Sequence, residues 1–261
     1  AWSEPEAGSD LASLRSTATR TEGGWLLNGQ KTWSSRSSFA DLGFGLFRSD
    51  PEAQRHRGLT YFMFDLRAPG VTVRPIAQLD GEPGFAELFL EDVFVPDRDV
   101  LGEVNKGWEV AMATTSSERG LSLRSPGRFM ATASRLVDLY KRYRETCDPA
   151  LRKEVIDAYA AAEAYRWYTF GTVTRMSQGG EIGADSSMNK VYWSEMDVRT
   201  HEAALAMIGD RLELDEGSPA AEDHASWLKG FQFALAGPIY AGTNEIQRNI
   251  IAERVLGLPR K

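Results

Sequence analysis

The strongest constraint on the fold is a change in the character of the sequence near residue 103. Before it, short runs rich in aromatic and β-branched residues are separated by turn pairs such as Asn-Gly and Pro-Gly, as strands and their turns require. This pattern predicts strands at 25–27, 44–47, 59–66, 71–76 and 85–95. After residue 103, long stretches are typical of helices. We therefore predict an α+β chain with two domains, an antiparallel β domain over 1–103 and an antiparallel helical bundle over 104–261.

The helical half contains recognisable start and stop signals. One long helix is expected over 108–143, disturbed at Ser125-Pro126-Gly127 because proline cannot continue a helix. Asp148 followed by Pro149 is typical of a helix start. Helices are expected from there to about 176, then over 185–214, 221–236 and 243–255.

Charge and composition exclude several classes of function. A net charge of −7 argues against a nucleic acid or an anionic membrane surface as partner. No apolar run approaches the roughly 18 residues that span a bilayer. A single cysteine, Cys147, excludes an internal disulfide framework and suits a reducing cytosol, so we expect a cytoplasmic protein. The chain starts at Ala1 within a polar segment, which we interpret as the interior of a longer polypeptide.

General catalytic and metal motifs give no function. The three histidines, His56, His201 and His224, have no metal-ligand spacing, so no metal is expected. Gly43-Phe-Gly45 lacks the third glycine and the following helix of a dinucleotide fingerprint. There is no P-loop and no Gly-x-Ser-x-Gly sequence.

Three segments together resemble the acyl-CoA dehydrogenase family. They are Ser3-Glu-Pro-Glu-Ala-Gly-Ser-Asp10, Asn28-Gly-Gln-Lys-Thr-Trp-Ser-Ser35, and the run from Gly237 to Arg248 that contains Tyr-Ala-Gly-Thr-Asn-Glu. Their order and separations span nearly the whole chain. The family has an N-terminal helical domain before the β domain. The resemblance implies that this domain is absent here and that the chain starts inside the first flavin-binding loop.

The resemblance implies flavin adenine dinucleotide (FAD) as cofactor, bound between the β domain and the bundle. Trp33 would pack its indole on the isoalloxazine ring, and Ser35 would offer a hydroxyl near the flavin N5 atom. The first residues of the last helix would offer backbone N–H groups to cofactor oxygens. The cofactor-binding residues implied in this way are Trp2, Ser3, Ser9, Trp33, Ser34, Ser35, Thr243, Asn244 and Glu245.

Ala241 stands where many family members carry the glutamate that removes the α-proton of an acyl-CoA thioester. A methyl group cannot accept a proton, but the backbone N–H of Ala241 could still stabilise the thioester oxygen. In a minority of the family the base lies on the first bundle helix, directly before an arginine. Glu118 before Arg119 fits that pattern, and desolvation there should raise the pKa of Glu118. The substrate-binding residues implied are Ser9, Arg119, Ala241 and Gly242.

Two functions of different class follow from these residues. The first is a catalytic acyl-CoA dehydrogenase that uses Glu118 as base, and the second is a non-catalytic subunit that completes the flavin site of a partner chain. An acyl-CoA oxidase is a third alternative, less in keeping with the short chain. Dehydrogenases of this kind pass electrons to an electron-transferring flavoprotein, which is therefore an expected acceptor.

Two motifs by which homotetrameric members hold a neighbour's flavin are missing. Lys141 to Pro149 contains no Thr-Phe-Gly, and Asp210 and Arg211 replace the glycines that let backbone approach a diphosphate. The segment 79–84 also lacks the Arg and Ser that the family often has there. We therefore expect a heterotetramer with a second acyl-CoA dehydrogenase-like subunit. Such pairs occur among actinobacterial enzymes of steroid side-chain breakdown, so a steroid side-chain acyl-CoA is the leading substrate hypothesis.

Overall fold

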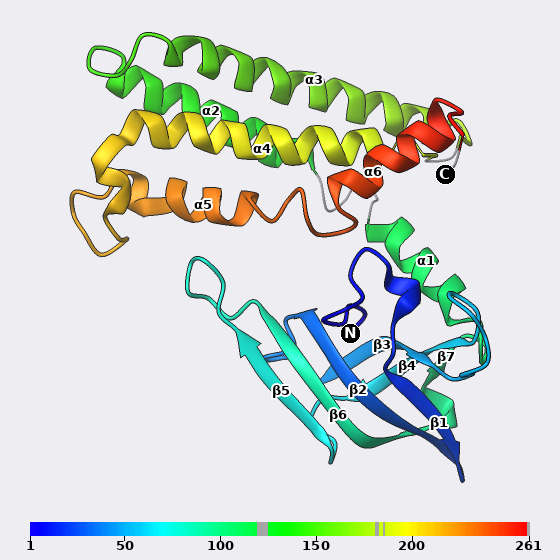
Figure 1. Ribbon diagram of the computed structural model, residues 1–261. Coiled ribbons are helices and arrows are strands. Elements are labelled where there is room, and N and C mark those ends of the chain that lie inside the picture. The colour runs from blue at the N-terminus through cyan, green and yellow to red at the C-terminus, as the bar shows by residue number, and fades with distance from the viewer. Residues whose placement is uncertain (119–124, 181–182, 185, 260–261) are drawn as a thin grey trace. The chain divides into compact units, whose positions relative to one another are not determined.

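The computed structural model describes residues 1–118, 125–180, 183–184 and 186–259, with the side chains of 115–118 left out. The chain forms two compact units, Ala1–Ser117 and Glu118–Lys261. The first contains a β-sheet and the second a helical bundle (Figure 1). Each unit is described separately below.

The first unit is a seven-stranded sheet in the order β5-β6-β2-β1-β3-β4-β7. Its strands are β1 (Thr17–Thr21), β2 (Gly24–Ser35), β3 (Leu42–Arg48), β4 (Leu59–Asp65), β5 (Val71–Ile76), β6 (Phe85–Pro96) and β7 (Val100–Leu101). All neighbours pair antiparallel except β1 and β3, which meet in parallel at Thr17 and Arg48. The predicted antiparallel β fold is confirmed. Strand β1 was not predicted, because only Ala18 of its five residues is buried and the rest are polar or charged.

Alternating residues of the sheet form its core. Trp25, Leu27, Phe47, Phe62 and Leu88 are among the buried side chains of the largest cluster. A smaller cluster joins the N-terminal loop to the sheet through Ala7, Leu14, Leu46, Leu59, Tyr61 and Ala111. The loop includes a short 3₁₀ turn, η1 (Leu11–Ser13), and a second 3₁₀ turn, η2 (Asp97–Asp99), precedes β7. The loop is thus packed onto the sheet.

Helix α1 (Gly107–Glu118) follows the sheet, and all but its last residue belong to the first unit. A Cβ at Gly107 would lie 2.6 Å from the backbone of Thr60 and Tyr61, so only glycine lets α1 start this close to β4. The helix expected over 108–143 is instead two helices, because α2 (Pro126–Tyr143) begins separately, at the Ser125-Pro126-Gly127 sequence where a disturbance was predicted. Ser125 caps α2, and Pro126 is its first residue.

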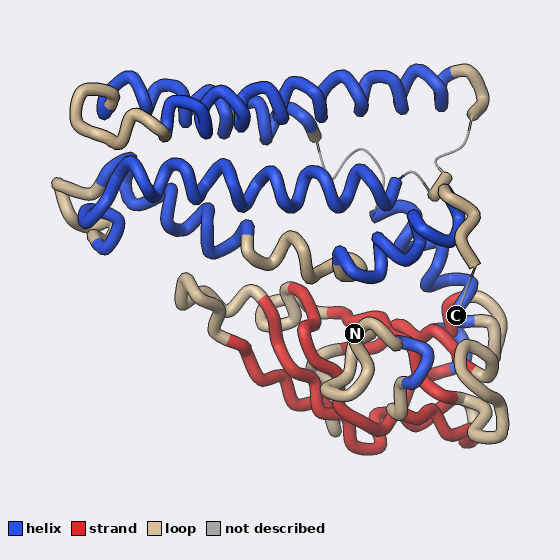
Figure 2. Tube along the Cα trace, turned by 45° about the horizontal axis from the view of Figure 1, so that its top comes forward, coloured by secondary structure: helices blue, strands red, loops and turns tan. Residues whose placement is uncertain are grey.

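The second unit is a helical bundle (Figure 2), as predicted. It consists of α2, α3 (Leu151–Ser177), α4 (Ser186–Ile208), α5 (Ser226–Ala234) and α6 (Asn244–Ile250), with the short turns η3 (Gly209–Glu213), η4 (Glu222–Ala225) and η5 (Ile251–Val255). Helix α4 contacts α2, α3, α5 and α6 and is the centre of the bundle. Helix α3 begins two residues later than Pro149, with Asp148 Oδ1 accepting from the N–H of Ala150 at 2.8 Å.

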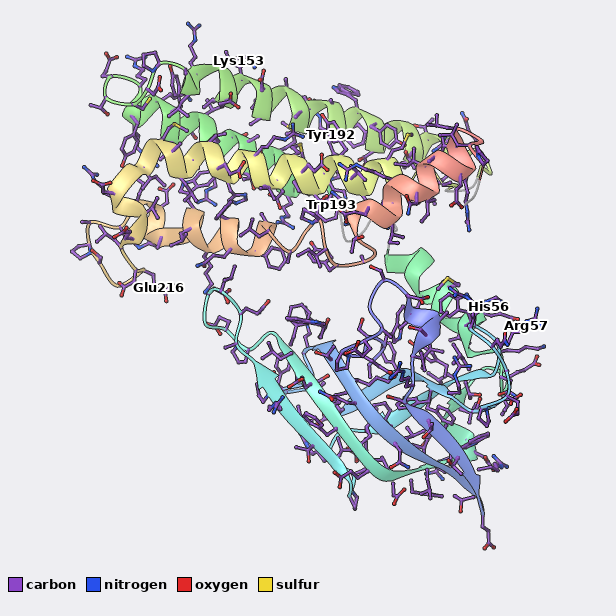
Figure 3. The ribbon with its side chains drawn as sticks, in the orientation of Figure 1. His56, Arg57, Lys153, Tyr192, Trp193 and Glu216 are labelled. Carbon is purple, nitrogen blue, oxygen red and sulfur yellow. The ribbon has the colours of Figure 1, made fainter. Side chains whose placement is uncertain are left out.

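Aromatic side chains fill the space around α4. Trp193 is buried and lies against Phe129 and Tyr240, with ring centroids at 5.9 and 6.1 Å. Its neighbour Tyr192 (Figure 3) stacks parallel to Tyr165 of α3 at 6.4 Å. Adjacent residues of α4 therefore pack on two different parts of the bundle.

Helix α3 is apolar on two faces. Its inner stripe of Val155, Ala158, Ala162, Tyr165, Thr169 and Thr172 is buried in the bundle. Ile156, Tyr159, Trp167 and Phe170 lie outside this stripe and are 55%, 39%, 63% and 49% exposed. A cavity of about 220 Å³ lies nearby, with lining residues Ala164, Tyr165, Tyr168, Met188, Asn189 and Tyr192. A helix that faces water on one side normally carries polar residues there, so this outer face has the composition of a covered surface.

Within the described ranges, no helix is both long and apolar enough to cross a membrane.

Candidate functional site

The N-terminal loop contacts β2 at the first resemblance motif. The N–H of Thr32 donates to the carbonyl of Ser3 at 2.8 Å, and Trp2 Nε1 donates to Tyr61 Oη at 2.8 Å. Trp2 and Ser3 are half-buried, whereas Ser9 is exposed further along the loop. The structure thus brings Trp2 and Ser3 next to β2, with Trp33 directly after Thr32.

A buried ion pair joins this loop to β2. Lys31 is fully buried, and its ammonium donates to Glu4 Oε1 at 2.8 Å, to the carbonyl of Leu46 at 2.7 Å and to that of Trp2 at 3.4 Å. Burial lowers the pKa of Lys31 to about 8, against the opposing charge of Glu4. For Glu4, burial is outweighed by Lys31 and by backbone donors, which hold its pKa below the usual value.

The role of Lys31 was not found from the sequence, although a signal was present. In β2 the inward side chains are Trp25 and Leu27, and counting on in steps of two reaches Lys31. A lysine at an inward position requires a buried partner. Glu4, in the first resemblance motif, is that partner.

Trp33 projects from an irregularity in β2. The pairing of β2 with β6 shifts between Lys31 and Ser34, and Trp33 has a left-handed φ of 56°. Its indole is 59% exposed and meets Phe85 edge to face at 6.0 Å. Ser34 is buried, and its Oγ has no hydrogen-bond partner among the residues described, while Ser35 is exposed. This β-bulge turns a large aromatic face outward.

The Tyr-Ala-Gly-Thr segment lies in the helical unit, and its two central residues have a left-handed backbone conformation. Ala241 and Gly242 have φ values of 54° and 84°. Gln247, fully buried, donates its amide to their carbonyls at 3.4 and 3.2 Å. In the described part of the chain, the N–H groups of Ala241 and Gly242 donate no hydrogen bond. Two successive free N–H groups of this kind can bind an oxygen that carries negative charge.

Helix α6 starts directly after this segment. Thr243 caps it by accepting from the N–H of Ile246 at 3.3 Å. Asn244 is 2% exposed and bonds Lys190, Ser194 and Glu195 of α4. Its side chain thus anchors α6, a role that the sequence did not suggest. Glu245 is exposed, and hydrogen bonds from its own backbone N–H and from the Thr243 side chain hold its pKa below the usual value.

The expected site residues therefore form two sets, one in each unit. Trp2, Ser3, Trp33, Ser34 and Ser35 lie on the β unit, where Trp2 and Ser3 are bonded to β2, and Ser9 is on the same N-terminal loop. Ala241, Gly242, Thr243, Asn244 and Glu245 are consecutive in the helical unit. Glu118 is the last residue of α1, but its side chain is outside the description, and so is all of Arg119. No group of three or more His, Cys, Asp or Glu side chains in the described residues is arranged to hold a metal.

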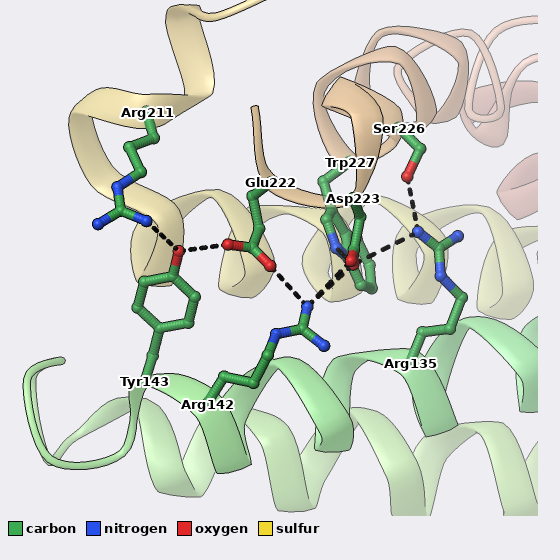
Figure 4. A network of polar contacts seen from close by, with 8 residues as sticks. All are labelled: Arg135, Arg142, Tyr143, Arg211, Glu222, Asp223, Ser226 and Trp227. Atoms are coloured by element: carbon green, nitrogen blue, oxygen red, sulfur yellow. Dashed lines mark hydrogen bonds and ion pairs between the residues drawn. The ribbon is translucent and has the colours of Figure 1, made fainter. Parts of the chain in front are cut away.

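Two of the three segments without the expected flavin motifs, 141–149 and the one with Arg211, contribute to one polar network (Figure 4). Arg142 donates to Glu222 at 2.8 Å and to both carboxylate oxygens of Asp223 at 3.1 Å. Tyr143 Oη donates to Glu222 at 2.6 Å and accepts from Arg211 at 3.4 Å. Burial followed by the Glu222 carboxylate raises the pKa of Tyr143. The carboxylates of Glu222 and Asp223 therefore occupy donors of Arg142 and Tyr143, which would otherwise be available to an anion.

These elements are those of a known class of protein. Residues 1–93 match the family model "Acyl-CoA dehydrogenase, middle domain" and residues 105–256 match "Acyl-CoA dehydrogenase, C-terminal domain". The chain belongs to the acyl-CoA dehydrogenase family, which confirms the resemblance.

Among the relatives, acyl-CoA dehydrogenase IpdE1 of Mycobacterium tuberculosis is 38% identical over 262 residues, covering 100% of this chain and 66% of IpdE1. The chain thus spans just under two thirds of that relative. The solved Tcur3481–Tcur3483 steroid ACAD superposes with a TM-score of 0.92 at 26% identity, covering 100% of this chain and 67% of the other. The ChsE4–ChsE5 complex from Mycobacterium tuberculosis gives a TM-score of 0.86 at 29% identity, covering 100% and 68%.

Proposed function

We propose that the chain is a catalytic subunit that dehydrogenates an acyl-CoA thioester between its α- and β-carbons, with FAD as cofactor and Glu118 as base. The observation that carries the proposal is the pair of N–H groups at Ala241 and Gly242, which donate to no acceptor among the described residues. Removal of an α-proton places negative charge on the thioester oxygen, and preorganised N–H donors stabilise such charge. Family membership supplies the reaction class.

The residues of the β unit fit a flavin. The exposed Trp33 indole offers a broad apolar face, and Ser35, two residues further on, offers an exposed hydroxyl. Ser34 contributes a buried Oγ that has no partner among the described residues. When bound, the flavin would accept the hydride that leaves the β-carbon. Trp2, Ser3, Trp33, Ser34 and Ser35 would hold it on this unit, and Thr243, Asn244 and Glu245 on the other.

The division of labour among the chain's own residues follows from their chemistry. The Ala241 side chain cannot take a proton, but its N–H, with that of Gly242, can hold the thioester oxygen. Glu118 is the residue that the family pattern offers as base, and Arg119 would neighbour the substrate. Ser9, exposed on the N-terminal loop, would contact the acyl-CoA.

The test is Glu118→Gln in the complete protein, purified with any subunit that accompanies it. We expect loss of turnover with the flavin still bound, because the amide has the shape of the carboxylate but cannot accept the proton. Glu109→Gln is the matched control, since Glu109 is an exposed carboxylate on the same helix, and it should remain active. Near-normal turnover of Glu118→Gln would contradict the proposal.

A non-catalytic subunit is the second candidate, and the absent carboxylate at Ala241 is the observation that favours it. One simple measurement distinguishes the two candidates. A yellow complex whose flavin is bleached by an acyl-CoA without oxygen, and is not bleached in Glu118→Gln, supports catalysis by this chain. Equal bleaching in the variant places the base on the partner.

We further propose that the partner is a second acyl-CoA dehydrogenase-like subunit in a heterotetramer. Two observations support this. In the network around Arg142 and Tyr143, carboxylate oxygens already accept from the guanidinium and the hydroxyl. In homotetrameric members this region holds the flavin of a neighbouring subunit. The outer face of α3 has the apolar composition of a covered surface. Native mass spectrometry with flavin quantification tests the proposal, and we expect half as many flavins as subunits. A homotetramer with four bound flavins would refute it.

The substrate hypothesis is a bulky acyl-CoA, with a steroid side-chain thioester as the leading example. It rests on the likeness to the solved steroid ACAD Tcur3481–Tcur3483. Electron-transferring flavoprotein is the expected acceptor. An acyl-CoA panel from short chains to steroid side-chain thioesters, assayed with that acceptor, tests both; preference for short straight chains would contradict the substrate hypothesis.

A further inference from the structure

The buried pair Lys31–Glu4 lies beyond the end of β1, where no strand pairs with both β2 and β3. The last β1–β2 pair is Thr17 with Asn28, and β1 meets β3 only at Thr17 and Arg48. Beyond Thr17, therefore, β2 and β3 have no strand between them. Lys31 spans this gap, because it is on β2 and donates to the carbonyl of Leu46 on β3 at 2.7 Å.

The same pair holds the N-terminal loop at two points. Lys31 reaches the carbonyl of Trp2 and the carboxylate of Glu4 near the start of the loop. The carboxylate of Glu4 also accepts from the N–H of Arg15 at 2.6 Å and of Ser16 at 2.9 Å, where the loop ends. One ion pair thus connects β2, β3 and both ends of the loop.

Stability alone does not explain this arrangement. Removing two charges from water costs free energy, and an apolar pair of similar volume at such positions is often equally stable or more so. What the ion pair adds is a fixed geometry, since three acceptors, two on the N-terminal loop and one on β3, hold the Lys31 ammonium in one place. Trp33 leaves the sheet at the bulge two residues further on.

We propose that Lys31 and Glu4 are positioning residues that fix the N-terminal loop against β2, so that Ser3 and the Trp33 indole are presented together to the flavin. This inference rests on the proposed function. Neither residue contacts the reacting atoms in this scheme. Their effect passes through the hydrogen bond from Thr32 to Ser3 and through the register that sets the Trp33 bulge.

The experiment compares Lys31→Met, Glu4→Gln and the double variant with wild type in the full-length complex. Amide hydrogen exchange reports on the loop and on Thr32, and FAD titration reports on the site. We expect faster exchange in residues 3–16 and at Thr32, and a flavin Kd raised by about tenfold, which corresponds to about 1.4 kcal/mol of binding free energy. The double variant guards against misfolding, because it leaves no unpaired buried charge.

The matched control is Thr60→Val. Thr60 is fully buried on β4 and bonds Ser49 at 2.6 Å and the N–H of Asn105 at 2.8 Å, without contacting the loop motif. It should lower the melting temperature but leave loop exchange and flavin Kd unchanged. The proposal is overturned if the Lys31 and Glu4 variants behave like this control. If wild type itself binds no FAD, the proposed function fails, and hydrogen exchange alone decides whether the pair fixes the loop.

Discussion

Trp33 shows how the conformation of one residue determines what a surface offers. Its position in a twelve-residue strand would place it by simple alternation on the same face as Lys31. The register shift and the left-handed φ of 56° instead expose 59% of the side chain. The resemblance motif predicted a role for Trp33, but its exposure depends on pairing with β6, which local sequence does not determine.

At this scale we predict that Trp33→Ala weakens FAD binding by about two- to tenfold, because one aromatic contact contributes ~0.5–1.5 kcal/mol. Folding stability should change by only about 0.5 kcal/mol, because the indole is mostly outside the core. Phe39→Ala is the control, since Phe39 is 71% exposed on the same unit. Flavin titration and urea unfolding measure the two effects, and equal flavin affinity of both variants would contradict the role of Trp33.

A second residue-scale prediction concerns pH and Lys31, whose pKa falls from 10.5 to about 8 on burial. Between these values the native state has released the proton while the unfolded chain still holds it. The unfolded state then binds more protons, so the contribution of Lys31 to stability rises with pH. The stability of wild type relative to Lys31→Met/Glu4→Gln should therefore increase above about pH 8, by at most ~3 kcal/mol. Urea unfolding from about pH 7 to about pH 10 measures it, and a constant difference would be evidence against the buried charge.

At the scale of elements, the agreement between sequence and structure follows the strength of the local signal. The strands with dense aromatic and β-branched runs, such as β4 and β6, were predicted. Strand β1 was not, because its Thr-Ala-Thr-Arg-Thr sequence is polar and its pairing comes from β2. The start of α2 was indicated by Ser125-Pro126-Gly127, whereas no local signal gave the end of α1 at Glu118.

One short element is built from three successive non-glycine residues in the left-handed region. Asp223, His224 and Ala225 have φ values of 48°, 54° and 56°. Such residues cost roughly 1–2 kcal/mol each. Asp223 is held by Arg142 and by Trp227 Nε1 at 2.8 Å, contacts that offset this cost. The strain therefore lies beside the network of Figure 4.

We predict that Ala225→Gly stabilises the helical unit by about 1 kcal/mol, because glycine has no Cβ to clash at positive φ. The matched control is Ala221→Gly, four residues earlier at φ −69°, where glycine should destabilise by about 0.5–1 kcal/mol. Urea unfolding of the two variants tests the prediction. If both substitutions lower the free energy of unfolding equally, glycine relieves no backbone strain at residue 225.

At the scale of the molecule, the proposed assembly with a second subunit would bury the outer face of α3. We predict that Trp167→Glu prevents association with the partner subunit while the chain still folds, because Trp167 is 63% exposed and its substitution places a charge in an apolar contact. Gln178→Glu adds the same charge at an exposed position just beyond α3 and should assemble normally. Co-purification and circular dichroism measure assembly and folding. A complex of normal size with Trp167→Glu would exclude this face from the interface.

The second apolar face of α3 also has a consequence for how the protein is made. A newly synthesised copy without the proposed partner exposes Ile156, Tyr159, Trp167 and Phe170 to water. Such a surface favours aggregation and recognition by chaperones and proteases. We therefore expect that overexpression of this chain alone yields insoluble or rapidly degraded material. Co-expression with the proposed partner at an equal level should raise its cellular abundance.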